Sequence, residues 1–330
     1  MMKLSGPYHL PQFLDQQIAA LFQGGEIPAF DFSKPAGEPA LAPASSVSWV
    51  VFKNSVSLFI GGIAAVIMEF ALPGVRSVVW DHYSAASGNP GFIPMKGESL
   101  DPTKAPDLKE AFNIGLELPA DDPEIVSGAR FRALNLWPEA PGFKDTMLDF
   151  YNAVWSLGKT LHSAFATELG IESDFFDDKL SRSLATLRLL RYPPRPAALD
   201  EGQLGAGEHT DYECVTLLAT DEVGGREVHS RDGRWLAAPY IPDTFVCNIG
   251  DCLMRWTNDV YVSTPHRVVS PPNRERYSVA FFMGPNPEAI VECLPGCATD
   301  ETPAKYTPIR GDDYLESRLN PTYEKSGQVS

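Results

Sequence analysis

Residues 209–225 read HTDYECVTLLATDEVGG and combine two potential metal ligands with a β-like run. His209 and Asp211 lie two positions apart, shortly before the apolar run Val215–Ala219. On an extended strand, side chains at positions i and i+2 point to the same face. One imidazole and one carboxylate can therefore reach one metal ion, and a neighbouring strand must supply the third ligand.

The third ligand is expected at His266, which lies 55 positions after Asp211 and opens the β-like run His266–Val269. Two histidines and one carboxylate on one face of an octahedron leave three adjacent positions open, as in non-haem Fe(II) oxygenases. Those positions allow a metal to bind a cosubstrate and O2 together. An HxD pair alone arises by chance, so the assignment depends on further residues.

Those further residues lie in the run Arg276-Tyr277-Ser278. Arg276 and Ser278 share one face of a strand, and a guanidinium fork with a hydroxyl can hold the distal end of a dicarboxylate. Tyr192, in LRLLRYPP (187–194), offers another hydroxyl. Phe282 falls on the same face as Arg276 and is either a pocket-lining residue or a core residue.

The hydrophobic pattern changes along the chain. Residues 143–169 carry apolar side chains at three- and four-residue steps, which predicts one amphipathic helix closed by Gly170. After Leu184, short β-like runs alternate with turn signals, which is typical of a sandwich or jelly roll. These runs are Ala185–Tyr192, Val215–Ala219, Glu227–Ser230, Phe245–Ile249, His266–Val269 and Tyr277–Met283. Residues 101–141 are predicted to be rich in loops.

From about Gly91 to Pro295 the chain resembles the isopenicillin N synthase-like branch of the 2-oxoglutarate/Fe(II)-dependent dioxygenases. The similarity is clearest in LRLLRYPP (187–194), HTDYECVTLLATDEVGG (209–225), NIGDCLMRWTNDVYVSTPHRV (248–268) and RYSVAFFMGPNP (276–287). The resemblance implies an α+β fold, with a double-stranded β-helix (jelly roll) core at about residues 184–290 and flanking helices. It also implies a dioxygenase domain over residues 90–330.

The same resemblance implies a chemistry. The iron ligands, which are the catalytic residues, would be His209, Asp211 and His266. The residues that bind the distal carboxylate of 2-oxoglutarate would be Arg276, Ser278 and Tyr192, and Phe282 would face the substrate. With Fe(II), 2-oxoglutarate, O2 and ascorbate as reductant, the enzyme would hydroxylate or desaturate a small organic molecule and release succinate and CO2. Two alternatives stay open: an iron oxidase of this fold that uses no 2-oxoglutarate, and an inactive fusion that only binds a ligand.

The chain departs from the family pattern at two positions near these motifs. Leu190 stands where the family often has an asparagine two residues before the cosubstrate tyrosine. Arg226 follows Gly224-Gly225, where a leucine is usual, so it places a charge at an apolar position. Neither departure removes a ligand of the predicted metal site.

The first 89 residues do not match that family beyond a strand-like run at Ile27–Phe32. Residues 46–89 instead resemble the start of the MpaB/rubber-oxygenase-like (DUF2236) proteins, which are helical and in some members haem-binding. We therefore expect an atypical, partly helical N-terminal segment over 1–89 that adds nothing to the main sheet, with a helix at Val56–Leu72 and His82 far from the metal. A chain starting near Gly91 is then expected to bind Fe(II) about as well as the full chain.

The charge balance limits the partners. The 330 residues include 43 acidic and 27 basic side chains, a net charge of −16, which repels nucleic acid and anionic membranes on average. The longest uncharged apolar stretch, Val56–Met68, is shorter than the roughly 20 residues of a membrane-spanning helix. The five cysteines suggest no disulfide framework, so a reducing, cytoplasmic location and a small-molecule substrate are expected, with the oligomeric state left open.

Overall fold

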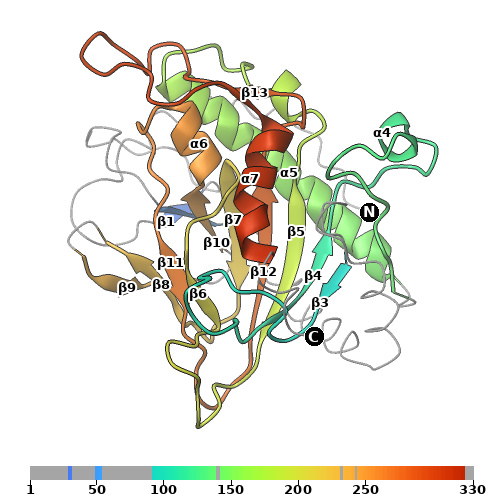
Figure 1. Ribbon diagram of the computed structural model, residues 1–330, viewed down its shortest axis with the longest axis vertical. Helices are drawn as coiled ribbons and strands as arrows, with labels where there is room; N and C mark the ends of the chain where they lie inside the picture. Colours follow the sequence, from blue (N-terminus) through green and yellow to red (C-terminus); the bar gives the residue numbers. More distant parts are fainter. Residues whose placement is uncertain are drawn as a thin grey trace.

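The computed structural model describes residues 29–31, 49–53, 91–138, 142–230, 233–241 and 244–323, and its centre is two β-sheets (Figure 1). The larger sheet has eight strands in the order β1 (Ala29–Asp31), β2 (Trp49–Lys53), β10 (Thr244–Ile249), β7 (Val215–Thr220), β12 (Arg276–Met283), β5 (Thr186–Tyr192), β4 (Glu110–Ile114) and β3 (Gly91–Ile93). The smaller sheet has the order β6 (Ala206–His209), β11 (His266–Val268), β8 (Arg226–His229) and β9 (Trp235–Ala237). This arrangement is the predicted jelly roll.

All six predicted β-like runs are strands, and each begins and ends within one residue of the predicted bounds. The prediction of a loop-rich segment at 101–141 is wrong for β4, which is a buried strand of the larger sheet. Strand β4 gave no alternating pattern because all five of its residues are buried. Strands β8 and β9 pair antiparallel.

The long helix α5 (Phe143–Glu168) covers one face of the larger sheet and contacts β12 and β7 (Figure 1). It begins after Gly142 and ends before Gly170, and both glycines have positive φ angles, of 78° and 71°. Its apolar stripe packs on the side chains of β12 that point to this face, Val279, Phe281 and Met283, in one hydrophobic core. The predicted amphipathic helix is confirmed, and its aromatic residues are core residues.

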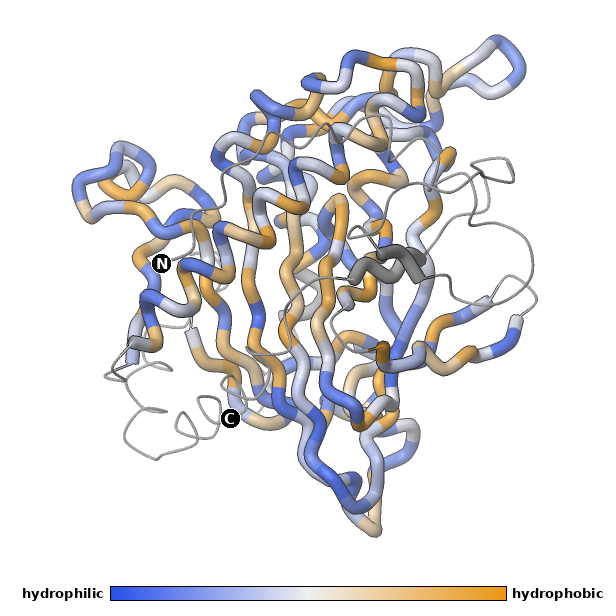
Figure 2. The backbone as a smooth tube through the Cα atoms, turned by 180° about the vertical axis from the view of Figure 1, so that it is seen from behind, coloured by the Kyte–Doolittle hydropathy of each residue, from blue (hydrophilic) through white to orange (hydrophobic). Residues whose placement is uncertain are grey.

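The opposite face of β12 carries the alternate residues Arg276, Ser278, Ala280 and Phe282, which line a cavity. The smaller sheet supplies part of the facing wall, and helix α7 (Gly311–Tyr323) adds Leu315 and Leu319. The remaining short elements are α4 (Pro123–Val126), a 3-10 turn η4 (Asp178–Leu180), α6 (Asp251–Trp256), β13 (Ile290–Val291) and β14 (Ile309–Arg310). Figure 2 shows the central strands largely hydrophobic and the projecting loops largely hydrophilic.

The prediction that residues 1–89 add nothing to the main sheet is wrong for two short segments. Strand β1 pairs parallel with β2, and β2 pairs antiparallel with β10 along its whole length. The predicted helix at Val56–Leu72 and His82 lie outside the described residues, and the proposed boundary near residue 90 stays a prediction. Within the described part of the chain, no helix is both long enough and apolar enough to cross a membrane.

Candidate metal and cosubstrate site

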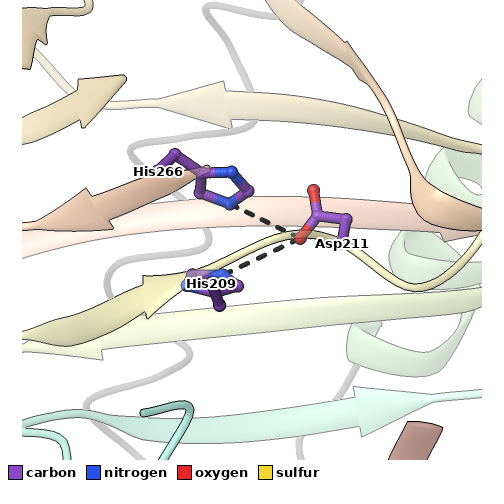
Figure 3. Close-up of side chains that lie close together, drawn as sticks. All are labelled: His209, Asp211 and His266. Atoms are coloured by element: carbon purple, nitrogen blue, oxygen red, sulfur yellow. Dashed lines mark ion pairs between the residues drawn. The ribbon is translucent and has the colours of Figure 1, made fainter. Parts of the chain in front are cut away.

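Three residues predicted to bind a metal converge at one end of the smaller sheet. His209 is the last residue of β6 and His266 is the first of β11, and the two are direct partners in the antiparallel register. Their rings lie 4.2 Å apart between centroids. Asp211 lies two residues beyond the end of β6, not on the extended strand that the sequence suggested. One potential ligand atom from each residue lies within 4.8 Å of the others (Figure 3).

The two imidazoles present the same ring nitrogen to the centre of this group. His209 Nδ1 lies 2.7 Å from the carbonyl oxygen of Gly207, and His266 Nδ1 lies 3.1 Å from that of Thr264. Since a carbonyl oxygen only accepts, each Nδ1 carries a proton, and each Nε2 is turned toward the centre of the group. These Nε2 atoms face Asp211 Oδ1 at 3.8 and 3.5 Å.

Burial and the neighbouring His266 hold the pKa of His209 well below its usual value, so His209 is neutral. A neutral imidazole with a free Nε2 is the form that binds a metal ion.

The second oxygen of Asp211 is held in place from outside the group. Its Oδ2 accepts hydrogen bonds of 2.6 Å from Thr216 Oγ1 and 2.6 Å from Asn248 Nδ2. Burial alone would raise the pKa of Asp211, but the nearby His266, His209 and Arg226 outweigh it and hold the pKa below its usual range. A buried charged carboxylate with two imidazoles, and with no thiolate in the group, is a donor set that fits Fe(II).

The predicted carboxylate-binding residues line the same cavity. Arg276 and Ser278 are each only 1% exposed, and the guanidinium donates to Ser278 Oγ at 3.1 Å and to Thr220 Oγ1 at 3.2 Å. Its carbon Cζ lies 4.8 Å from the ring centroid of Tyr192, so the tyrosine contributes its aromatic face. The Nε of Arg276 is buried and has no hydrogen-bond partner among the described residues. A buried donor of this kind fits an anionic ligand.

Several polar residues that the sequence analysis did not single out form another wall of the cavity. Arg188 on β5 pairs with Glu98, and Lys109 lies 2.6 Å from Asp107 and 3.4 Å from Glu98. Asn113 is the register partner of Arg188 on β4. The alternation of β5 could have revealed Arg188, because it shares a face with Leu190 and Tyr192. Glu98 and Lys109 come from outside the predicted strands and gave no such signal.

Glu213 also lines the cavity, two residues after Asp211. Burial, with the charge of Asp211 as the next cause, raises the pKa of the Glu213 carboxyl to about 8. Phe282 lines the cavity, on the face of β12 that carries Arg276, and it also packs against a hydrophobic cluster of the core. The two positions that depart from the family pattern, Leu190 and Arg226, both lie in the cavity wall.

Comparisons with known proteins agree with this geometry. Residues 184–285 match the model of the 2OG-Fe(II) oxygenase superfamily. The chain is 36% identical over 263 residues to the 2-oxoglutarate-Fe(II) type oxidoreductase hxnY of Emericella nidulans, covering 78% of this chain and 75% of that protein.

Solved structures show the same similarity. A full-length Neurospora crassa protein, solved in complex with alpha-KG and thymine, superposes with a TM-score of 0.74 at 31% identity, over 91% of this chain and 98% of that one. A 2OG-Fe(II) oxygenase family protein from Caulobacter crescentus gives 0.71 at 34% identity, over 84% and 90% of the two chains. The chain therefore belongs to the 2OG-Fe(II) oxygenase superfamily and is an oxidoreductase that uses Fe(II), 2-oxoglutarate and O2.

Proposed function

We propose that His209, Asp211 and His266 bind the catalytic Fe(II), and that Arg276 and Ser278, with the ring of Tyr192, bind the distal carboxylate of 2-oxoglutarate. The observation that carries this proposal is that both groups open into one cavity, one group from the smaller sheet and the other from the larger sheet. A metal-binding face and a buried cation in one cavity suit a cosubstrate that is both a chelator and a dicarboxylate.

The bound Fe(II), 2-oxoglutarate and O2 supply the oxidation of a substrate C–H bond, by hydroxylation or desaturation, with succinate and CO2 as the other products. The protein's part is to position the reactants and exclude water. Asp211 brings a charge that the metal neutralises, and Thr216 and Asn248 fix its orientation. Phe282 and Leu190 supply apolar surface next to the polar groups of the cavity.

The remaining wall of the cavity suggests the class of substrate. It carries a guanidinium (Arg188), an amide (Asn113) and a carboxyl (Glu213), so it offers both donors and acceptors, and Phe282 offers a flat apolar surface. We therefore propose a small, flat, polar molecule such as a pyrimidine base. The similar Neurospora crassa protein was solved with thymine and with 5-formyluracil, which supports this choice.

The decisive experiment is succinate formation from 2-oxoglutarate by the full chain with Fe(II), ascorbate and O2, first without and then with candidate substrates. We expect slow succinate release without a substrate and faster release with a pyrimidine. Asp211→Ala serves as the inactive control. An oxidase that uses no 2-oxoglutarate would consume O2 with its substrate but form no succinate, and an inactive binding protein would do neither.

The five cysteines are all free thiols, which supports the proposal of a reducing, cytoplasmic location. A fluorescent fusion of the full chain, imaged in its own cells, tests that location. We further propose that residues 90–330 form the dioxygenase domain, with 1–89 an atypical N-terminal segment.

A further inference from the structure

Arg226 is an arginine buried in the wall of the catalytic cavity. It is the first residue of β8 and only 7% exposed, and its register partner on β11 is Val268, two residues from His266. Arginine is rarely so buried unless it is paired. Its side chain lines the same cavity as the three proposed iron ligands and Arg276.

The backbone before Arg226 explains how this side chain comes to face the cavity. Gly225 has a φ angle of 90°, and a Cβ atom there would lie 2.4 Å from the carbonyl oxygen of Val269. The same Cβ would lie 3.9 Å from Cδ of Arg276. Only glycine allows β8 to begin this close to the neighbouring backbone, so the Gly224-Gly225 turn places Arg226 beside Arg276.

The contacts of Arg226 lead to the metal end of the cavity. Its Nη2 donates to Asn248 Oδ1 at 3.1 Å, and Asn248 Nδ2 donates to Asp211 Oδ2 at 2.6 Å. Two hydrogen bonds therefore separate the guanidinium from a proposed iron ligand. Among the charges that act on Arg226, Asp211 attracts it and Arg276 repels it.

Arg226 and Arg276 are two buried guanidinium groups close enough to repel each other. Burial, together with repulsion from Arg276, lowers the pKa of Arg226 to about 10, so it is still a cation at neutral pH. Both guanidinium groups line one cavity, so an anion with two carboxylates that enters it can contact both. Arg276 accounts for one carboxylate of the proposed cosubstrate, and the other would enter nearer to Arg226.

We propose that Arg226 is a second cosubstrate-binding residue, which holds the carboxylate of 2-oxoglutarate that lies next to the iron. This inference rests on the proposed role of the cavity in binding 2-oxoglutarate. Each guanidinium then binds one carboxylate of 2-oxoglutarate: Arg226 the one next to the iron, and Arg276 the distal one. A leucine at position 226, usual in the family, cannot make this contact.

Binding of two ligands to the Fe(II)-loaded full chain without O2, measured by calorimetry, separates the two arginines. One ligand is 2-oxoglutarate, and the other is 2-oxopentanoate, which has a methyl group in place of the distal carboxylate. Arg226→Leu should weaken both ligands by at least about tenfold, because each has the carboxylate next to the keto group. Arg276→Leu should weaken 2-oxoglutarate alone. Arg226→Lys, which keeps the charge but not the fork, should fall between wild type and Arg226→Leu.

Other results overturn the inference. If Arg226→Leu binds both ligands as the wild type does at saturating Fe(II), Arg226 only supports Asp211 through Asn248, and its loss should appear in Fe(II) affinity instead. If Arg226→Leu weakens 2-oxoglutarate alone, the residue serves the distal carboxylate. If Arg226→Leu does not fold, the test rests on Arg226→Lys. Wild-type affinity of Arg226→Lys for both ligands would show that the guanidinium fork does not bind the carboxylate. Failure of the wild type to bind 2-oxoglutarate would refute the proposed function itself.

Discussion

Asn248 donates a hydrogen bond of 2.6 Å from its side-chain amide to Oδ2 of Asp211, the oxygen that is not the one facing the two imidazoles. Arg226 donates to the other end of the same amide. Because the amide oxygen accepts from Arg226, the amide cannot flip, and its nitrogen must face Asp211. A strand of the larger sheet thus fixes the orientation of a ligand that lies between the two sheets.

Replacing Asn248 should weaken metal binding without removing a ligand. Asn248→Ala leaves Thr216 as the one remaining side-chain donor that the structure shows on Asp211 Oδ2. Loss of such an orienting contact typically costs about 10–100-fold in metal affinity. Titration of the apoprotein with Fe(II) under anaerobic conditions measures the loss. Asn113→Ala, at the far wall of the same cavity, is the matched control and should keep the wild-type Fe(II) affinity.

Replacing Asp211 should abolish turnover. Asp211→Ala removes the one negatively charged ligand of the proposed site, so the two imidazoles alone hold Fe(II) weakly. We expect no bound iron after gel filtration and no succinate above background. The control Asp149→Ala, on the exposed side of α5, should retain bound iron and succinate release. Near-normal succinate release by Asp211→Ala would show that the iron is held elsewhere.

Replacing Arg276 should raise the requirement for 2-oxoglutarate. Arg276→Ala deletes a buried, charge-assisted donor pair, a loss of more than about 1.5 kcal/mol or over tenfold in affinity. Arg276→Lys should rescue this only in part, since an ammonium cannot form the fork. The KM for 2-oxoglutarate in succinate release is the measurement. An unchanged KM in both variants would assign Arg276 to the substrate or to the fold.

His162 should make the protein less stable in acid. It is fully buried on α5 beside Phe165 and Phe176, and burial lowers its pKa from 6.5 to about 4. As the pH falls below 6.5, the unfolded chain takes up a proton that the folded chain refuses, so stability is lost between pH 6.5 and about 4. The loss from this residue is at most about 3 kcal/mol.

The test is urea unfolding at several pH values with His162→Phe as the comparison. The difference in free energy of unfolding between wild type and variant should change steadily across this range, to the disadvantage of the wild type at low pH. Parallel pH curves for the two proteins would show that His162 does not contribute.

A chain starting at Gly91 should be less stable than the full chain, contrary to what the sequence alone suggested. It lacks β2, so the backbone groups of β10 that pair with β2 would lie on an open sheet edge. Strand β10 also carries Asn248, whose register partner on β2 is Trp49. We expect a lower melting temperature, more aggregation by light scattering, and weaker Fe(II) binding. Equal values for both chains would show that β2 is dispensable.

Much of the site was predictable from spacing alone. A period of two on β12 places Arg276, Ser278 and Phe282 on one face, and all three line the cavity. The HxD pair and His266 were predicted to converge, and they do, although Asp211 lies beyond the strand. A turn after the end of β6 brings the Asp211 carboxylate to the two histidines as well as an extended strand would. The set of ligands was therefore predictable, although the backbone conformation at Asp211 was not.

The sequence by itself determined the residue types, the strand periodicity and the helix at 143–168, because these depend on local alternation and on glycines at the helix ends. Only the tertiary structure decided which residues hold the predicted ligands in place. Asn248, Arg226 and Asp211 belong to three different segments, and their chain of hydrogen bonds exists because the two sheets face each other. Strand β2 joins β10 for a similar reason, since pairing depends on which edge is open and not on the local pattern.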